Sequence, residues 1–405
     1  MALLPVGMHS FLSELPAAYS RRLEFWASAN SSRNGRQCMK IVVFGLSISS
    51  TWGNGHATLW RGLCRALARR GHSVVFFEHD VPYYAKNRDV FEITGGELIL
   101  YRDWPDAVCA ARCHLADADV GMVTSYCPHG IEATDLVLGS PAACKVFYDL
   151  DTPVTLARLN AGETTTYIGP RGLRDFDLVL SYTGGPALDA LRDILGARCV
   201  APLYGSVDPE VHRPAEPASH YRADLSYLGT YAEDRQTALE ALLIEPARRM
   251  PDRRFLIGGA LYPGAFPWSS NIFFVRHLPA TEHSSFYSSS RLTLNITRQA
   301  MARMGFCPSG RLFEAAACGV PILSDRWEGL DHFFEPGREI LIASDTRDAI
   351  DAIGLSDADL RRIAARARER TLSEHTADHR AAELEAALDG ALRTRHTAAL
   401  PAMES

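Results

Sequence analysis

The sequence predicts an α/β protein with two domains, each built on a doubly wound parallel sheet of the Rossmann type. Short, continuous apolar runs recur along the chain, and such runs are typical of strands that are buried on both faces of a parallel sheet. Stretches long enough for a crossover helix separate the runs. The chain has 405 residues, and single cores rarely grow beyond about 250 residues, so two domains are expected.

The first domain is expected to span residues 39–210, after an N-terminal extension of residues 1–38. Residues 28–36 of that extension are rich in Ser, Asn, Gly and Arg, which is typical of a linker. The first strand is predicted at residues 41–44, and the helix after it has apolar residues at helical spacing and ends at Gly71. The other predicted strands of this domain lie at residues 73–78, 98–101, 120–124, 145–148 and 178–181.

The second domain is expected to span residues 211–376. Four prolines between positions 202 and 217 break the alternating pattern, as an interdomain connection does. The last segment, residues 377–405, contains a helical stretch rich in Ala, Glu and Leu that can cross back onto the first domain. The predicted strands of the second domain lie at residues 225–228, 255–257, 272–275, 292–295 and 320–323.

The composition gives no reason to expect a nucleic-acid or membrane partner. The formal net charge is -6, which offers no general attraction to polyanions, and no run approaches the ~18 apolar residues of a membrane span. Among the nine scattered cysteines, the close pair Cys109 and Cys113 has no second pair to complete a zinc site. Arg21 and Arg22 are not followed by the apolar stretch of an export signal. We therefore expect a cytoplasmic protein with reduced cysteines and no metal site.

A glycine-containing loop between the first strand and the first helix is the first candidate ligand site. Gly53, Asn54 and Gly55 lie in this loop, at the carboxyl end of a strand, where open sheets bind ligands. Glycine lets backbone N–H groups approach an anion, and a helix N-terminus favours negative charge. The loop is not a dinucleotide fingerprint, because the third glycine would fall at Thr58. The alternative is that the two glycines only form a turn.

The segment 308–319 is the second candidate site. Ser309 is suited to cap a helix that has Gly310 and Arg311 in its first turn, and Glu314 lies three residues further on the same face. A diphosphate could contact the helix N–H groups and the guanidinium, while the carboxylate accepts two ribose hydroxyls. The alternative is a surface ion pair between Arg311 and Glu314, worth less than about 1 kcal/mol.

The string RLFEAAACGVPILSD, which covers this segment, resembles the nucleotide-binding helix of glycosyltransferases with two Rossmann lobes, the family 4 type. Glu314 matches the glutamate that binds ribose in that family. A second glutamate of the family, eight positions earlier, contacts the donor sugar, and this chain has Phe306 there. Three further segments resemble the family in the same order, namely GNGHATLWRGLCRALARRGHSVVFF, LYGSVDPEVHRP and LGTYAEDRQ.

Several short motifs are similar to the CgeB-like branch, which is named after a spore-maturation protein. They are DTP, SYTGG, SVDP, LSYLGTY, NITR and RLFEAAACG, and the likeness covers about residues 39–390. The resemblance implies the GT-B fold, in which two Rossmann-like domains face each other across an interdomain cleft. It also implies transfer of a hexose from a UDP-, GDP- or dTDP-sugar to a small-molecule or glycan acceptor, with retention of configuration. The nucleotide sugar would be a co-substrate, with no metal and no permanent cofactor.

The donor roles follow from the same resemblance. Arg235 and Arg298, with the turn 309–311, are expected to stabilise the leaving diphosphate. In the segment LGTYAEDRQ, Thr230 stands where the family has an arginine, and Arg235 stands where it has a lysine. The nucleobase would lie near His277 and Leu278. The alternatives are an interlobe ion pair for Arg298 and an ordinary strand-end histidine for His277.

The acceptor side would be formed by the first domain. Asp149 and Asp151 follow a predicted strand and are expected to face the cleft, where either could bind an acceptor hydroxyl or act as general base. Asp151 could equally form a simple turn. His56 and His129 are alternative proton acceptors near neutral pH.

Two other functions stay open at this point. A nucleotide-sugar 2-epimerase on the same architecture would need a different set of carboxylates. A surface or spore-coat protein could keep the fold without activity, and Thr230 and Phe306 are the residues that favour this alternative.

Overall fold

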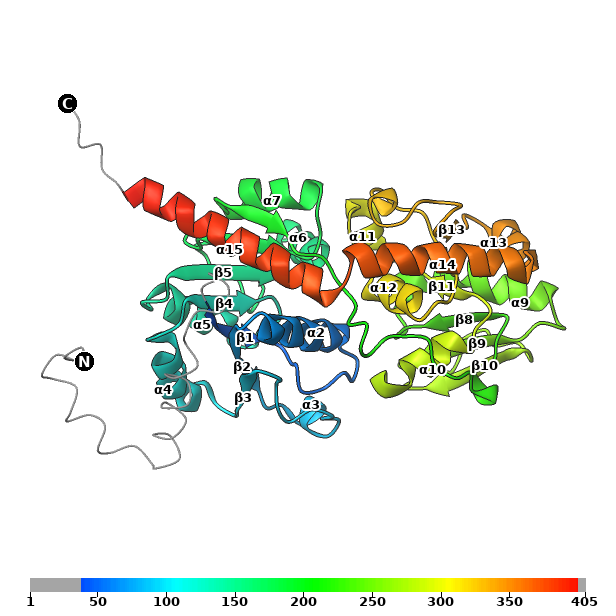
Figure 1. Ribbon diagram of the computed structural model, residues 1–405, viewed down its shortest axis with the longest axis horizontal. Coiled ribbons are helices and arrows are strands. Elements are labelled where there is room, and N and C mark those ends of the chain that lie inside the picture. The colour runs from blue at the N-terminus through cyan, green and yellow to red at the C-terminus, as the bar shows by residue number, and fades with distance from the viewer. Residues whose placement is uncertain (1–37, 400–405) are drawn as a thin grey trace, which may run out of the picture. The chain divides into compact units, whose positions relative to one another are not determined.

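The computed structural model describes residues 38–399, which contain two parallel sheets (Figure 1). Both sheets belong to one compact unit, Lys40–Ser405. Of the predicted N-terminal extension, residues 1–38, only Cys38 lies within the described residues.

The first sheet has seven parallel strands in the order β3-β2-β1-β4-β5-β6-β7. Ile41 in the first strand pairs with Val74 on one side and Val120 on the other, so the strand order reverses there and creates a ligand-binding switch point. The strands are β1 (Lys40–Gly45), β2 (Ser73–His79), β3 (Gly96–Tyr101), β4 (Val120–Thr124), β5 (Cys144–Asp149), β6 (Leu178–Ser181) and β7 (Val200–Pro202). The helices between them are α2 (Gly55–Arg69), α3 (Pro82–Ala85), α4 (Trp104–Leu115), α5 (Gly130–Leu138), α6 (Thr152–Asn160) and α7 (Pro186–Leu195).

The second sheet has six parallel strands in the order β10-β9-β8-β11-β12-β13. Its strand order reverses between β8 and β11, so it has a switch point of its own. The strands are β8 (Leu225–Leu228), β9 (Phe255–Gly259), β10 (Ile272–Arg276), β11 (Thr293–Asn295), β12 (Ile322–Ser324) and β13 (Leu341–Ile342). The helices are α8 (Gln236–Leu239), α9 (Glu245–Arg249), α10 (His283–Ser288), α11 (Gln299–Met304), α12 (Gly310–Ala317), α13 (Thr346–Gly354), α14 (Asp357–Glu374) and α15 (Ala377–Ala399).

The predicted fold class, two doubly wound parallel sheets, is confirmed. Most strands lie at the predicted apolar runs, and β4 and β8 have the predicted bounds. Strand β12 begins at Ile322 rather than at residue 320, because the chain first turns through Gly319 at a φ of 77° and then through Pro321, which has no N–H for the ladder. Strands β7 and β13 were not predicted, since two or three residues at a sheet edge are too few to form an apolar pattern.

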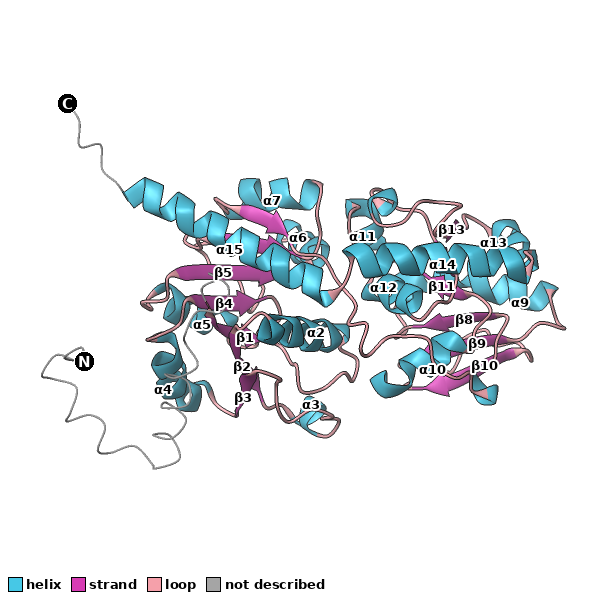
Figure 2. Ribbon diagram, viewed as in Figure 1, coloured by secondary structure: helices cyan, strands magenta, loops and turns pink. Residues whose placement is uncertain are grey.

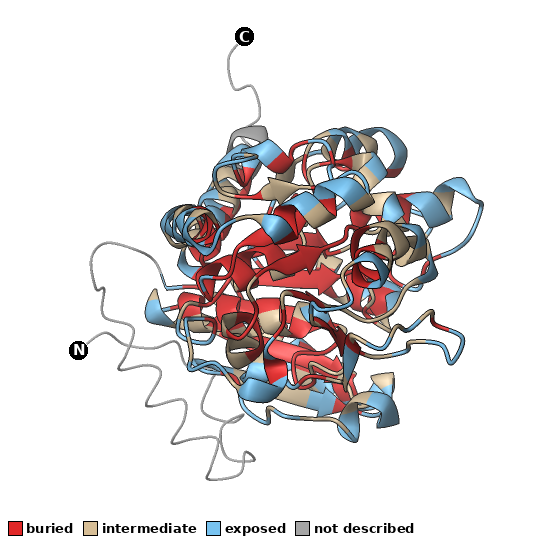
Figure 3. Ribbon diagram, turned by 90° about the vertical axis from the view of Figure 1, so that its right-hand side faces the viewer, coloured by how far each residue is buried: buried red, intermediate tan, exposed pale blue. Residues whose placement is uncertain are grey.

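Each sheet is buried between helices, as Figures 2 and 3 show. Strands β4 and β5 are buried along their whole length, and β1 is buried from its second residue onward. Burial on both faces is the reason why these strands are continuous apolar runs rather than alternating ones.

Helix α15 packs against α2 of the first domain, whereas α14 packs against α12 of the second domain (Figure 1). Arg70 donates to both carboxylate oxygens of Glu385 on α15, at 2.6 and 2.5 Å, and Nε2 of His72 lies 2.7 Å from one of them. The hydrogen bond from Arg70 lowers the pKa of Glu385 to about 2. The last helix therefore ties the end of the chain to the first domain. Within the described part of the chain, every helix is too short or too polar to cross a membrane.

Candidate active site

A cavity of about 500 Å³ is lined by residues at the carboxyl ends of strands from both sheets. The first sheet contributes residues after β1, β4, β5 and β6, and the second contributes residues after β8, β9, β10 and β11 together with the start of α12. Doubly wound sheets bind ligands at this edge. The cavity is therefore the candidate active site.

The cavity contains all of the predicted site residues except Asp149 and His129. The residues that line it are Gly53, Asn54, Gly55, His56, Asp151, Thr230, Arg235, His277, Leu278, Arg298, Ser309, Gly310, Arg311 and Glu314. They come from loops that are far apart in sequence, and the fold brings them into one space. Their individual roles stay predictions.

Asp149 is one of the two exceptions, and the expectation that it faces the cleft is wrong. Its side chain is fully buried, accepts hydrogen bonds from the Asp151 N–H and the Thr155 hydroxyl, and does not line the cavity. Burial raises its pKa to about 6. Asp149 is the last residue of β5, and its carboxylate organises the start of α6, which leaves Asp151 as the carboxylate in the cavity.

The glycine-containing loop after β1 is held by a buried carboxylate that the sequence analysis missed. Glu78, in β2, accepts hydrogen bonds from the backbone N–H groups of Ile48 and Ser49 and from two serine hydroxyls. Asn54 caps α2 by accepting from the His56 N–H at 3.1 Å, and Gly53 has a φ of 61°. The loop shape is thus fixed by hydrogen bonds, and it presents the N-terminus of α2 to the cavity.

Helix α12 also begins at the cavity. Ser309 occupies the N-cap position with extended backbone angles, but its hydroxyl makes no capping hydrogen bond, so the predicted side-chain cap is not formed. The first N–H groups of a helix have no intrahelical partner, and Gly310 and Arg311 belong to that first turn. This end of α12 is therefore suited to bind an anion.

Three guanidinium groups meet around the start of α12. Arg311 donates to Asn295 at 3.1 Å and lies over the Tyr227 ring at 5.2 Å, so the surface ion pair with Glu314 is not formed. Arg235 donates to the Thr230 carbonyl at 3.3 Å, while its Nε is buried without a partner. Burial lowers the pKa of Arg235, and the nearby cations Arg311 and Arg298 lower it further.

Only Arg298 among these three has an acidic partner in the described residues, Asp234, at 3.4 Å. Within the described residues neither Arg235 nor Arg311 has an ion-pair partner, although the carboxylates of Asp151 and Glu314 line the same cavity. An anionic ligand would reduce the repulsion between the guanidinium groups. It would also supply the acceptor that the Arg235 Nε–H lacks.

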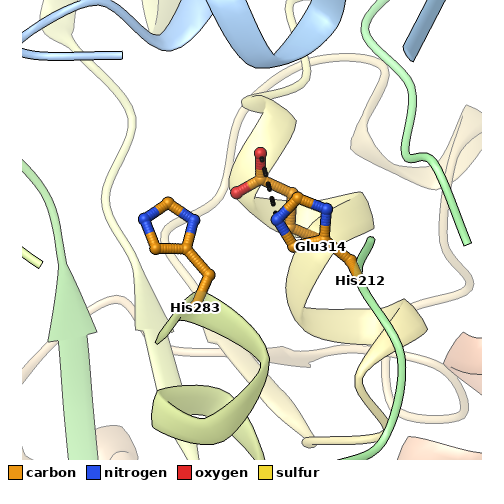
Figure 4. A group of neighbouring side chains, drawn as sticks. All are labelled: His212, His283 and Glu314. Atoms are coloured by element: carbon orange, nitrogen blue, oxygen red, sulfur yellow. Dashed lines mark ion pairs between the residues drawn. The ribbon is translucent and has the colours of Figure 1, made fainter. Parts of the chain in front are cut away.

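Glu314 lies next to two histidines that the sequence analysis did not assign (Figure 4). Nε2 of His212 is 4.0 Å from Oε1 of Glu314, and His283 completes a group whose ligand atoms lie within 4.8 Å of one another. Burial lowers the pKa of both histidines to about 4, so both rings are neutral at pH 7.

The predicted nucleobase end contains a ring contact between the two domains. The Trp52 ring, from the loop after β1, lies 3.4 Å from the His277 ring, measured between centroids. His277 has a φ of 51°, and burial lowers its pKa. Of this pair, His277 lines the cavity beside Leu278.

On the side of the first domain, Asp151 interacts with Tyr126. Burial raises the pKa of Tyr126, and the negative charge of nearby Asp151 raises it further. The Tyr126 ring also stacks against His56 at 6.2 Å. His129 does not line the cavity. Its Nδ1 lies 3.2 Å from the Tyr101 hydroxyl.

Phe306, at the position of the family's sugar-binding glutamate, lies at the contact between the domains. Its carbonyl accepts from the Gly184 N–H of the first domain, and its own N–H donates to Glu328. A Cβ atom added to Gly185 or Gly329 would lie 2.4 or 2.5 Å from the ring. The ring thus fills the space between two glycines, which explains why an apolar residue stands here.

Sequence reasoning missed the aromatic residues of the cavity, which include Tyr126, Tyr182 and Tyr287. Isolated aromatic residues in a sequence are most often core residues, so they carried no signal. The sequence likewise contains no pattern that reveals which non-glycine residues have a positive φ. Three of the four non-glycine residues with positive φ in residues 38–399, namely Tyr126, His277 and Phe306, lie in or beside the cavity, and such conformations gather at functional sites.

Comparison with known proteins gives one family match and many similar structures. Residues 235–386 match the family described as "Glycosyl transferase-like". No curated protein sequence matches the chain.

Solved structures match the chain over almost all of its length. A sucrose-phosphate synthase from Thermosynechococcus elongatus is 17% identical with a TM-score of 0.65, over 89% of this chain and 100% of that one. HepE from Anabaena, in complex with UDP and glucose, is 12% identical with a TM-score of 0.59, over 87% and 100%. An alpha-glucosyltransferase in complex with UDP and DNA is 11% identical with a TM-score of 0.61, over 87% and 100%.

At these identities the structural likeness shows the fold, which is that of GT-B glycosyltransferases. Together with the family match in the second domain, it supports a glycosyltransferase.

Proposed function

We propose that this glycosyltransferase of the GT-B type transfers a hexose from a nucleoside diphosphate sugar to an acceptor, with the donor bound by the second domain. The observation that carries the proposal is the convergence of Arg235, Arg298 and Arg311 with the start of α12 and Glu314 at one sheet edge. We also assign the chain to the CgeB-like branch, on the motifs LSYLGTY, NITR and RLFEAAACG.

The diphosphate lies against the three guanidinium groups and the first turn of α12. Arg235 supplies its unpartnered Nε–H, and the anion relieves the repulsion that lowers the pKa of this residue. As the bond between the sugar and the diphosphate breaks, negative charge grows on the leaving oxygen. The three cations are in place to stabilise that charge.

The nucleoside extends from the diphosphate toward His277. Glu314 accepts the two ribose hydroxyls, and its carboxylate is only 14% exposed, so this contact is made in a partly dehydrated site where charge-assisted hydrogen bonds are strong. The base lies near His277 and Leu278, below the Trp52 ring. The UDP found in similar structures makes uracil the first base to test.

The acceptor binds on the side of the first domain, with a hydroxyl near Asp151. In a retaining transfer, the bond from the sugar carbon to the diphosphate oxygen breaks with its electron pair going to the diphosphate. The acceptor oxygen then bonds to that carbon from the same face, and its proton goes to the leaving diphosphate. Asp151 positions the acceptor, and Tyr126 lines the cavity on the same side.

Calorimetry tests the donor site. We expect UDP, GDP or dTDP to bind the chain in the presence of EDTA, and Glu314→Gln to weaken that binding about 10- to 150-fold, which corresponds to 1.5–3 kcal/mol. The matched control is Glu335→Gln, because the Glu335 side chain is 52% exposed and its carboxylate accepts hydrogen bonds from Arg338 at the surface. Its affinity should equal that of the parent.

A comparison of two nucleotides, each bound to the parent and to Glu314→Gln, isolates the ribose contact. The 2′-deoxy form of the bound nucleotide should bind the parent more weakly than the ribonucleotide, and Glu314→Gln should bind the two equally. If no nucleotide binds the parent, the donor site is wrong. Turnover of a bound donor without transfer to any acceptor would favour an epimerase instead.

A further inference from the structure

Three metal-ligating side chains that are distant in sequence meet at the back of the donor site. His212 comes from the connection between the two sheets, His283 begins α10, and Glu314 lies on α12 (Figure 4). One ligand atom of each lies within 4.8 Å of the other two. The sequence analysis expected no metal site, because it could examine only ligands with short spacings.

The two imidazoles lack the partners that buried polar groups normally have. His212 is 1% exposed, and neither of its ring nitrogens has a hydrogen-bond partner. Buried side-chain nitrogens without partners are rare and indicate an ion, a water or a ligand that the protein accommodates.

His283 also has a ring nitrogen without a partner. Its Nδ1 is buried and makes no hydrogen bond in the described residues. A neutral imidazole nitrogen is the commonest metal ligand among protein side chains, so His283 can contribute a ligand atom to the group.

Neither a hydrogen bond nor ring stacking explains why these three side chains lie together. The 4.0 Å between Nε2 of His212 and Oε1 of Glu314 is too long for a hydrogen bond. The two histidine rings are 5.8 Å apart between centroids and tilted by 40°, so they do not stack. The three groups surround a gap rather than fill it.

We propose that His212, His283 and Glu314 form a binding site for a divalent transition-metal ion such as Zn²⁺. Two imidazoles and one carboxylate are a ligand set that zinc accepts with a fourth position left open. Magnesium and calcium prefer oxygen ligands, so they are excluded by the two nitrogens. Tetrahedral zinc needs ligand atoms about 3.3 Å apart, which the side chains reach by closing the gap by about 1.5 Å.

The ion would regulate donor binding. His283 and Glu314 line the cavity, and a carboxylate bound to an ion cannot accept two ribose hydroxyls as well. Metal and nucleoside then exclude each other. This consequence rests on the proposed ribose role of Glu314, whereas metal binding itself does not.

Cobalt(II) titration of the full chain, stripped with EDTA, tests the site. We expect one Co²⁺ per chain, with the visible absorption of a tetrahedral complex, and displacement of the cobalt by Zn²⁺. His212→Phe keeps an aromatic ring in the buried position and should lower the metal affinity at least about 10- to 100-fold. His220→Phe, at an exposed histidine, is the matched control and should bind like the parent.

A second variant keeps the test valid if His212→Phe does not fold. His283→Asn, at the cavity wall, should lose the same absorption band. The proposal is overturned if the folded parent shows no tetrahedral band, or if either folded variant binds Co²⁺ like the parent.

Competition with uridine separates the two proposals, since uridine lacks the phosphates that chelate metals in solution. We expect uridine to displace Co²⁺ from the parent. A cobalt band that resists uridine would refute the shared use of Glu314 and leave the metal site standing. Failure of UDP to bind in EDTA would instead refute the donor site alone.

Discussion

Replacement of Arg235 by methionine should stabilise the donor-free protein and weaken donor binding at the same time. The Arg235 Nε is buried without a partner, and an unsatisfied buried donor costs about 1–3 kcal/mol. The neighbouring cations Arg298 and Arg311 add repulsion. Methionine keeps an unbranched apolar stem and removes both costs.

The expected gain in the free energy of unfolding is smaller than the full cost of leaving the Arg235 Nε–H without a hydrogen bond. Arg235→Met also loses the 3.3 Å hydrogen bond to the Thr230 carbonyl, which is worth about 1 kcal/mol. The free energy of unfolding should therefore rise by about 1 kcal/mol without ligand. The affinity for the nucleoside diphosphate should fall by about 1.5–3 kcal/mol, or 10- to 150-fold, because a charge-assisted contact is lost.

Urea unfolding without nucleotide, and calorimetry with UDP, measure the two effects. Arg248→Met is the matched control, because Arg248 is 45% exposed and pairs with Glu240 and Glu245 at the surface. It should change either quantity by less than about 1 kcal/mol. If Arg235→Met lowers the unfolding midpoint and binds UDP like the parent, Arg235 is a structural residue and the reasoning is refuted.

Two further predictions concern the contacts that join the domains. Glu385→Gln should lower stability at pH 7 by at most about 3 kcal/mol, because Arg70 lowers the pKa of Glu385 from 4.5 to about 2. That stabilisation is complete above pH 4.5 and is lost as the pH falls toward 2, so urea unfolding of parent and variant should converge there, and a constant difference would contradict the ion pair. Phe306→Glu should destabilise the protein by about 1–3 kcal/mol, because it replaces a half-buried ring that packs against Gly185 and Gly329 with a carboxylate. A stable Phe306→Glu variant with faster hexose transfer would show that the position belongs to the donor pocket after all.

The sequence predicted those features that depend on local pattern. Strands such as β4 and β8 are short apolar runs, because both of their faces are buried. The cavity could be anticipated because the carboxyl ends of parallel strands must meet at one edge of the sheet. For the same reason, residues from loops as distant as those of Asn54 and Arg298 were expected together, and both line the cavity.

Features that depend on side-chain direction or on contacts between domains could not be predicted. Asp149 and Asp151 are two residues apart, but the first ends a strand and turns inward while the second lies in the loop, a difference that spacing does not reveal. Glu78 looked like the end of a strand, although its carboxylate holds the glycine loop. The Trp52–His277 contact joins two domains, and no local pattern reports such a pair.

Most of the buried side-chain polar atoms without a partner in the described residues lie in the second domain, whereas the first domain has such atoms on His79 and Asp149. In the first domain, the loop beside the cavity has its polar groups paired, as with Glu78 and its four donors. Around α12, by contrast, buried polar atoms of several residues have no partner in the described part of the chain. These residues are His212, Tyr227, Arg235, His283 and Tyr287.

A fold cannot leave so many buried groups unpaired in one place without a cost in stability. A ligand that supplies their partners would recover that cost, so binding energy and stability are linked here. In the proposed donor and metal sites, these same groups would bind the diphosphate, the ribose or the metal ion. It follows that variants which stabilise the free protein at these positions should bind the donor less well.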